Sequence, residues 1–265
     1  MQLTIVDWNL NGFSTLQGQG ELLAELEWDV CTLQEVTRDT WPELLGVLEP
    51  AGADVAIEHL PPLAGKLPKY YSAVLVREPW TFESHGSLRD VPSPERTLVG
   101  VMRRHSVQIS VASLALPPGV SWGRAGKCRQ AERIAAWLRD RALPTLVGID
   151  ANTPKWDRPE LEDTEWWHDR EAVLLGVDRA HDLRDSFRGW LEQDESRMEA
   201  VVAERPEGPL ALSHRRGRGK RSNPCRYDYV LASPEFEVLH VEYRYEEAIE
   251  AGSDHAFVVA RVEAA

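Results

Sequence analysis

The sequence predicts an α/β protein in which two β-sheets pack together and are covered by helices. Apolar runs of strand length, rich in Val, Ile and Leu, recur along the 265 residues. Segments with helical periodicity separate several of these runs. Two β-branched runs, 97–102 and 107–116, follow one another closely, as antiparallel neighbours do. Strands that partly alternate with helices and partly pair with a neighbour favour two packed sheets.

The other elements follow from the same patterns, taken along the chain. Further strands are expected in apolar segments at 3–6, 30–34, 71–77, 145–149, 226–231, 238–243 and 256–260. Helices are expected at 19–26, 41–48, 126–143 and 171–175. Pro42 suits the second of these helices because proline is tolerated in a first helical turn. Loops are expected in the Pro-rich segment 61–69 and the acidic Trp-rich segment 153–169, and the charged segment 189–207 is expected to be partly mobile.

Composition limits the class of protein. A hydrophobic fraction of 43% can form a substantial core, and no linker divides residues 1–265, so one domain is expected. The net charge of −13 excludes a generally basic nucleic-acid-binding surface but allows a local basic groove. Cys31, Cys128 and Cys225 show no metal-ligand spacing. Because no signal peptide or membrane-length apolar run occurs either, we expect a cytoplasmic monomer with no membrane association.

Carboxylate or carboxamide side chains recur where the predicted buried strands end. These residues are Asn9, Glu35, Asp150, Asn152, Asp228 and the Asp254-His255 pair. If these strand ends share one edge of a sandwich, several like charges meet and must shift their pKa values or bind a cation. Mg²⁺ prefers such oxygen ligands and usually binds one or two carboxylates plus substrate phosphate. The pattern therefore predicts phosphoester hydrolysis by a positioned water.

The same residues lie in short motifs that follow one another along nearly the whole chain. The motifs are Trp8-Asn9, Gln34-Glu35, Gly148-Ile149-Asp150-Ala151-Asn152, Asp185-Ser186-Phe187-Arg188, Arg226-Tyr227-Asp228-Tyr229 and Gly252-Ser253-Asp254-His255. In this order they resemble the endonuclease/exonuclease/phosphatase superfamily, which includes the DNase I-like and exonuclease III-like enzymes. The resemblance implies a four-layer αββα sandwich of two mixed sheets flanked by helices.

The resemblance also implies a metal site. Glu35 would coordinate Mg²⁺, for which Mn²⁺ is a possible substitute, and Asn9 and Asp254 would complete or support its ligand shell.

The remaining motif residues would then carry out the chemistry. Asp150 would orient or deprotonate the attacking water, and Asn152 would donate a hydrogen bond to the phosphoryl oxygen that gains charge. His255 would contact the scissile phosphate or transfer a proton, while Asp228 fixes its tautomer.

The chain departs from the family pattern at several positions. Where DNase I-like members have a second histidine and exonuclease III-like members a tyrosine, alignment on the following proline gives Ala115. Three interpretations stay open: a shifted alignment, metal-bound water as the acid, or an attenuated or engineered enzyme. Cys225 and Pro118 replace a tryptophan and an asparagine of the abasic-site enzymes, which argues against that specificity. Asn11 replaces a frequent acidic residue.

Two basic segments are candidates for substrate binding. The run 214–221 contains Arg215, Arg216 and Arg218, and on an acidic protein it could bind phosphates beside the cleft. Arg124, Lys127 and Arg129 could make similar contacts. A solvated loop and an ordinary helix surface explain these charges equally well.

The expected activity is a Mg²⁺-dependent phosphodiesterase, with DNA as the favoured substrate. One alternative is a phosphatase or phosphodiesterase on a small or lipid-like phosphate, because the net charge is acidic. Another is a nucleic-acid-binding protein that has lost turnover, as Ala115 suggests. Trp156, Trp166 and Trp167 are expected to pack within the protein rather than stack on bases.

Overall fold

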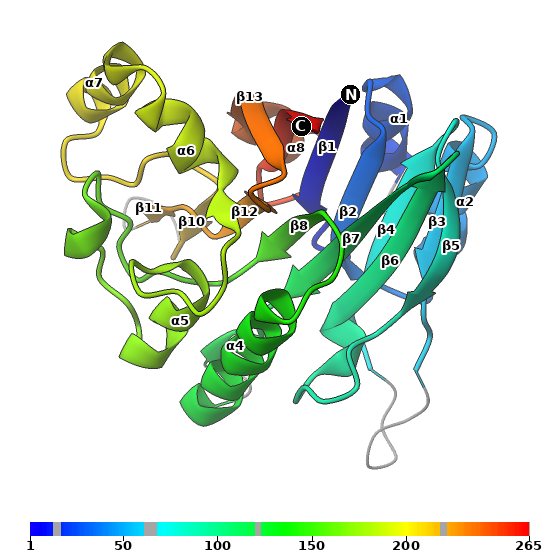
Figure 1. Cartoon of the computed structure of the whole chain (residues 1–265), viewed down its shortest axis with the longest axis horizontal. Helices are drawn as coiled ribbons and strands as arrows, with labels where there is room; N and C mark the ends of the chain where they lie inside the picture. Colours follow the sequence, from blue (N-terminus) through cyan, green and yellow to red (C-terminus); the bar gives the residue numbers. More distant parts are fainter. Residues whose placement is uncertain (13–16, 61–67, 120–122, 218–221, 265) are drawn as a thin grey trace.

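The structure, a computed structural model, contains two mixed β-sheets (Figure 1) and describes residues 1–12, 17–60, 68–119, 123–217 and 222–264. In the described chain the first sheet has six strands in the order β13-β14-β1-β2-β4-β3. Their bounds are β1 Gln2–Asn9, β2 Val30–Val36, β3 Ala53–Ile57, β4 Tyr71–Arg77, β13 Phe236–Arg244 and β14 Phe257–Ala264. The pair β1 and β2 is parallel, and the other pairs are antiparallel.

The second sheet follows the order β5-β6-β7-β8-β12-β9. Its strands are β5 Thr81–Gly86, β6 Thr97–Arg104, β7 Val107–Ala115, β8 Thr145–Asp150, β9 Arg184–Asp185 and β12 Asp228–Ala232. Here β7 and β8 are parallel. A short antiparallel pair, β10 His214–Arg216 and β11 Asn223–Cys225, lies outside both sheets.

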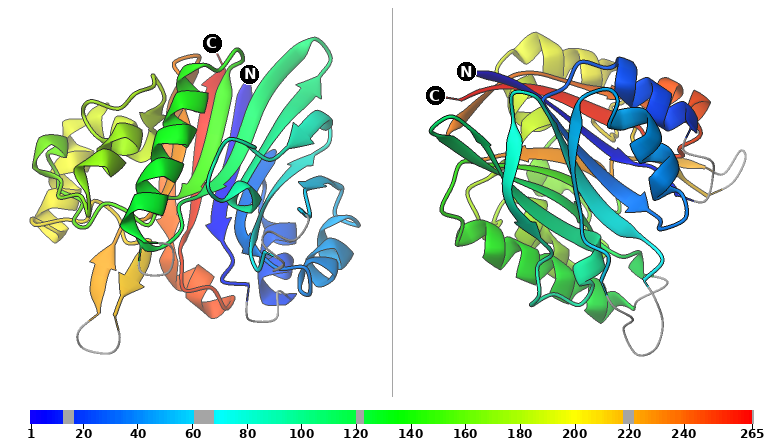
Figure 2. Two further views of the ribbon diagram at one scale, coloured as in Figure 1. Left: turned by 90° about the horizontal axis from the view of Figure 1, so that it is seen from below. Right: turned by 90° about the vertical axis from the view of Figure 1, so that its right-hand side faces the viewer.

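Helices cover the outer faces of the two sheets, so the four-layer sandwich is confirmed (Figure 2). The helices on the first sheet are α1 Gln17–Glu25, α2 Trp41–Leu48 and α8 Tyr245–Glu250. Those on the second sheet are α4 Arg124–Arg139 and α5 Ala172–Leu175. A further helix, α6 Ser186–Glu192, lies beside β12 and β13, where its Phe187 and Leu191 complete the core between the sheets, and α7 Glu195–Glu204 packs against α6.

The interface between the sheets is apolar at one end and polar beneath the strand ends that carry the motifs. Ile5, Val111 and Val230 belong to the apolar part. In the polar part the Asp7 carboxyl accepts hydrogen bonds from Thr32 and Gln34, both at 2.7 Å. Burial raises the pKa of Asp7 well above its usual range. The sheets therefore approach closely around one buried polar cluster.

Gly148 makes that close approach possible. A Cβ atom at this position would lie 1.9 Å from Thr32 Oγ1 and 2.1 Å from Asp7 Oδ1. Glycine, which lacks a Cβ, is the residue that fits here.

The charged segment 189–207, for which partial mobility was expected, is largely helical. It forms the end of α6 and all of α7. The Asp194 side chain accepts a hydrogen bond from Ser196 N and begins α7, while the Arg197 guanidinium lies 4.5 Å from the Trp190 ring. A helix cap and one cation–π contact thus order a sequence with little apolar periodicity.

The cysteines and the helices can be compared with the expectations from composition. The three cysteines are buried and form no disulfide. Among the described residues, no helix is both long and apolar enough to cross a membrane.

Candidate active site

The centre of the site is Asp150, which ends β8 in the second sheet. Its buried carboxylate accepts hydrogen bonds from Asn9 Nδ2 at 2.9 Å and from the Asn152 side chain and backbone N–H groups at 3.0 and 3.1 Å. Because Asn9 ends β1 in the first sheet, this carboxylate joins the two sheets. Three of the predicted residues therefore meet as the sequence indicates.

Asn152 is held in a conformation that few residues adopt. Its φ angle is 49°, in the left-handed region, where asparagine is tolerated better than most residues. The buried Lys127 ammonium donates to the Asn152 carbonyl at 2.7 Å and to Glu171 Oε2 at 3.1 Å. Lys127 is thus an internal support, although the sequence suggested a surface charge or a phosphate contact.

Both hydrogens of the Asn152 amide are engaged within the protein. Nδ2 donates to Asp150 Oδ2 at 3.0 Å and to the Leu116 carbonyl at 3.1 Å. A contact between Asn152 and a phosphoryl oxygen would therefore require one of these bonds to be exchanged.

His255 and Asp228 form the second half of the centre. His255 Nδ1 lies 3.0 Å from each carboxylate oxygen of the fully buried Asp228. Since a carboxylate accepts, Nδ1 carries a proton, and Nε2 is the ring atom left for chemistry. The backbone of His255 is fixed as well, because its carbonyl accepts from Trp8 Nε1 at 3.1 Å.

The charges of this centre depend on one another. Burial lowers the pKa of His255, but the carboxylates of Asp228, Asp150 and Asp254 outweigh it and raise the value to about 10. Burial raises the pKa of Asp150 to about 7, helped by the negative charges of Asp228 and Glu35 and opposed by His255 and Asn9. The site therefore combines a cationic imidazole with a carboxyl group that titrates near neutrality.

Glu35 lies at an irregularity in β2, where the pairing with β4 shifts register between Leu33 and Val36. Its φ angle is 57°, an unusual value for glutamate and a local strain typical of functional sites. A Cβ atom on the neighbouring Gly12 would lie 2.1 Å from the Glu35 carbonyl oxygen. The glycine therefore lets the first two strand-end loops pack against each other.

Arg96 and Tyr70 lie beside Glu35, and the sequence analysis singled out neither. Arg96 Nη1 is 3.6 Å from Glu35 Oε1, and the guanidinium lies 5.2 Å from the Tyr70 ring. Arg96 is only 6% exposed, yet its Nη1 has no hydrogen-bond partner among the described residues. Burial and the nearby Glu35 and Asp254 raise the pKa of Tyr70 to about 12, so its hydroxyl stays protonated at neutral pH.

Two groups of side chains in the described part of the chain could hold a metal ion, because the ligand atoms of each lie within 4.8 Å of one another: Asp150 with Asp228 and His255, and His214 with Asp254 and His255. Glu35 and Asp254 offer carboxylate oxygens that both act on the Tyr70 hydroxyl, and Asn9 Oδ1 accepts a hydrogen bond from Asn11 N at 3.0 Å, which leaves its second lone pair. All three are hard oxygen donors of the kind Mg²⁺ prefers. The buried cluster of Asp150 and Asp228 nearby also gains from an added positive charge.

The β10–β11 hairpin brings basic and aromatic groups to the same place. His214 stacks on His255, with ring centroids 4.4 Å apart. The Arg215 guanidinium lies 5.9 Å from the Tyr245 ring, and the Arg216 guanidinium lies 4.5 Å from the Trp167 ring.

Two other basic residues were predicted to contact the substrate. Arg124 is exposed at the first position of α4, and Arg218 lies outside the described residues.

Comparisons with known proteins agree with this geometry. The model of the Endonuclease/Exonuclease/phosphatase family matches residues 8–255. The chain belongs to this family. No sequence among the curated proteins matches it significantly.

Solved structures of family members share the fold at low sequence identity. A humanized D. rerio TDP2 is 14% identical with a TM-score of 0.68, and 99% of each chain is covered. D. rerio TDP2 complexed with single-strand DNA product is 12% identical with a TM-score of 0.66, again with 99% of each chain covered. An endonuclease/exonuclease/phosphatase from Beutenbergia cavernae is 18% identical with a TM-score of 0.65, covering 99% of this chain and 72% of that one.

Within the family framework, Ala115 lies at the centre of the site. It ends β7, is 1% exposed and pairs in register with Asp150, and the following residue, Leu116, donates its N–H to the Asp150 carbonyl at 2.8 Å. The methyl group offers no hydrogen bond at this position. Tyr70 and His214 carry the hydroxyl and imidazole groups that Ala115 lacks, and they come from other segments of the chain.

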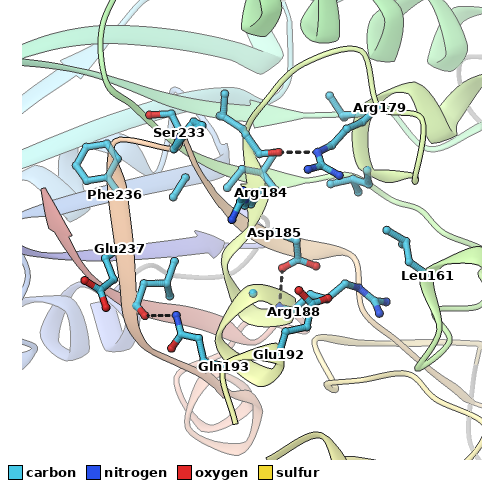
Figure 3. Close-up of a pocket in the computed structure, with 18 residues that line it drawn as sticks. Leu161, Arg179, Arg184, Asp185, Arg188, Glu192, Gln193, Ser233, Phe236 and Glu237 are labelled. Atoms are coloured by element: carbon cyan, nitrogen blue, oxygen red, sulfur yellow. Dashed lines mark hydrogen bonds between the residues drawn. The ribbon is translucent and has the colours of Figure 1, made fainter. Parts of the chain in front are cut away.

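A cavity of about 640 Å³ lies away from this centre, at the other end of β12 (Figure 3). Arg179, Arg188 and Glu237 line it, and none of the predicted catalytic or metal-binding residues does. The motif residue Asp185 also borders the cavity, and it forms an ion pair with Arg226 at 2.6 Å. Asp185 therefore supports the strand that carries Asp228 and lies outside the centre itself.

Proposed function

We propose that the protein is a divalent-metal-dependent phosphodiesterase that hydrolyses nucleic-acid phosphodiester bonds, DNA by preference, through attack of an activated water. The observation that carries the proposal is the buried cluster of Asp150, Asp228 and His255, whose carboxylate and ring atoms lie within 4.8 Å of one another. Burial raises the pKa of the Asp150 carboxyl to about 7, and the carboxylates raise that of the His255 imidazole to about 10. At neutral pH the first can accept a proton and the second can donate a hydrogen bond, as phosphoryl transfer to water requires.

Each residue of the centre has a role that follows from its contacts. Asp150 orients and deprotonates the attacking water, and its bonds from Asn9 and Asn152 fix the carboxylate plane. His255, whose Nδ1 is bound to Asp228, directs Nε2–H toward a phosphoryl oxygen. These donors and acceptors are held before the substrate arrives, so little reorganisation is needed during reaction.

Glu35 and Asp254 would hold the metal ion, with Asn9 as ligand or support. Mg²⁺ is the expected ion and Mn²⁺ its substitute, because all the donors are oxygen atoms. When bound, the ion supplies charge neutralisation at the phosphoryl group.

The substrate assignment rests on the groups around the centre. Arg215 and Arg216 follow His214, which stacks on His255, and this position supports their assignment as contacts to neighbouring phosphates. Arg218 and Arg124 are proposed as further contacts. One structural neighbour, D. rerio TDP2, is complexed with single-strand DNA product, which supports a nucleic-acid strand as the ligand.

Ala115 favours one second candidate, a nucleic-acid-binding protein with little or no turnover. A methyl group beside Asp150 removes one hydrogen-bonding group from the pocket. Loss of one proton donor typically costs about 10²–10⁴ in rate, so slow turnover is the expected consequence.

Hydrolysis of a substrate panel tests the proposal. Single-stranded DNA, duplex DNA, RNA and bis(p-nitrophenyl) phosphate are incubated with Mg²⁺ or Mn²⁺ and with EDTA. Asp150→Asn is the test variant, and Asp178→Asn, an exposed position, is the matched control. We expect metal-dependent cleavage of nucleic acid that Asp150→Asn abolishes. Turnover of the small diester alone would move the assignment to a small-molecule phosphoesterase, and binding without any turnover would support the second candidate.

A further inference from the structure

His214 is attached to the strand of His255 by its backbone and by its side chain. The two histidines form an isolated antiparallel β-bridge, and Ala256 N donates to the Ser213 carbonyl at 2.7 Å. The His214 ring adds a bond from Nδ1 to the Asp254 carbonyl at 3.0 Å. Because a carbonyl only accepts, Nδ1 is the protonated nitrogen of the neutral His214 ring.

The same ring stacks on two neighbours. Its centroid lies 4.4 Å from that of His255 with an interplanar angle of 27°, and 5.9 Å from that of Tyr227 with an angle of 21°. Tyr227 is held in turn, because its backbone N–H donates to Ser213 Oγ at 2.8 Å. His214 therefore has little freedom to move away from His255.

The contact with Asp228 does not by itself fix the tilt of the His255 ring plane. Both of its carboxylate contacts, at 3.0 Å, reach the same ring atom, Nδ1. A contact through one atom sets the direction of the ring but allows its plane to tilt about that contact, which moves Nε2. A stacked neighbour removes this tilt, since the two planes must stay nearly parallel to keep contact.

We propose that His214 is a positioning residue that fixes the ring plane of His255 by stacking and thereby aims Nε2 at the phosphoryl group. The proposal rests on the proposed function and adds the hairpin to the machinery of the site. The β10–β11 hairpin would then orient the His255 ring in addition to binding phosphates. The second imidazole of the site, that of His214, comes from β10, whereas β7 contributes Ala115.

Three variants separate stacking from the other contacts of the ring. His214→Phe keeps a stacking ring and loses both nitrogens. His214→Asn places an amide near the Nδ1 position and loses the ring. His214→Ala loses both. His85→Ala, at an exposed histidine on β5, is the matched control.

Steady-state kinetics on a labelled oligonucleotide gives the first readout. We expect His214→Ala and His214→Asn to lower kcat by about 10- to 100-fold with KM changed less than about twofold, because a displacement near 1 Å at a reacting group costs about that much. His214→Phe is expected to stay within about threefold of the wild type. Wild-type kcat in His214→Ala, or equal losses in His214→Phe and His214→Ala, would overturn the proposal.

A second readout does not depend on turnover. In ¹H–¹³C spectra the His255 ring signals, assigned with His255→Ala, should shift on loss of the stacked ring in His214→Ala and His214→Asn and remain near the wild-type positions in His214→Phe. If His214→Ala does not fold, the Asn and Phe variants carry the comparison. Unchanged His255 signals in His214→Asn would also overturn the proposal. Because these spectra need no substrate, they distinguish its failure from failure of the proposed phosphodiesterase function.

Discussion

Replacing Asp228 by asparagine removes the charge that keeps His255 cationic. The carboxylate oxygens lie 3.0 Å from His255 Nδ1, and at this distance two unit charges interact by about 5 kcal/mol at an effective dielectric constant near 20. Since one pKa unit corresponds to about 1.4 kcal/mol, the pKa of His255 should fall by about four units. It would move from about 10 to about 6.

The sign of the pH effect follows from the two raised pKa values. In the wild type, activity should rise as Asp150 ionises through about pH 7 and fall only when His255 loses its proton near pH 10. In Asp228→Asn the alkaline limb moves to about pH 6, because the unpaired buried ring is neutral above that value. Removal of the Asp228 charge lowers the pKa of Asp150, but loss of the His255 charge raises it by more, so the acid limb should move up.

The assay is kcat on a single-stranded oligonucleotide between pH 5.5 and 10 with saturating Mg²⁺. At pH 8 a histidine with a pKa near 6 is about 1% protonated, so kcat should fall by about 100-fold while the wild type is near its plateau. Asp178→Asn is the control, because this exposed carboxylate lies outside the site. If the Asp228→Asn enzyme keeps the wild-type kcat at pH 8 and an unchanged alkaline limb, the charge of Asp228 does not keep His255 protonated.

Three other substitutions test separate parts of the site. Glu35→Gln should raise the Mg²⁺ concentration for half-maximal activity by at least ~10-fold in a metal titration, since it removes a ligand charge. Lys127→Met should lower the free energy of unfolding in urea by about 3–5 kcal/mol, because the 1% exposed Glu171 loses its partner, and an unchanged midpoint would contradict the buried pair. Arg96→Gln should raise KM by about 10- to 100-fold through loss of a charged hydrogen-bond donor, whereas Arg104→Gln, at the exposed end of the strand β6 that follows Arg96, should not.

The sequence predicted the sheets where apolar runs are long and bounded by polar residues. The strand at 145–149 and the helix at 41–48 are found at Thr145–Asp150 and Trp41–Leu48. The edge strands β3 and β5 were not predicted, because their exposed faces break the apolar pattern. The core strands are buried on both faces and carry a much stronger signal.

The candidate site could be assembled from the sequence only where a residue lies at the end of a strand or directly before one. Asn9 and Asp150 end strands and His255 precedes β14, and the structure brings them to one centre. His214 and Arg96 could not be found in this way. Each reaches the centre through a tertiary contact between segments far apart in the chain, and each sits in a local sequence that reads as an ordinary surface charge.

For Lys127 the sequence suggested an exposed charge, whereas the structure buries this side chain. Helical periodicity places it on α4 but does not say which face is covered, and α5 with its preceding turn buries that face against Glu171. A lysine is seldom buried without a partner, and a partner 44 residues away cannot be recognised from spacing.

Cleavage of a single-stranded oligonucleotide in H₂¹⁸O with Mg²⁺ shows directly whether water attacks the phosphodiester bond. We expect the product phosphate to gain one ¹⁸O atom per bond broken, EDTA to prevent the reaction, and Asp150→Asn to abolish it under the same conditions. Cleavage without ¹⁸O incorporation, or wild-type incorporation by Asp150→Asn, would contradict attack by a water that Asp150 activates.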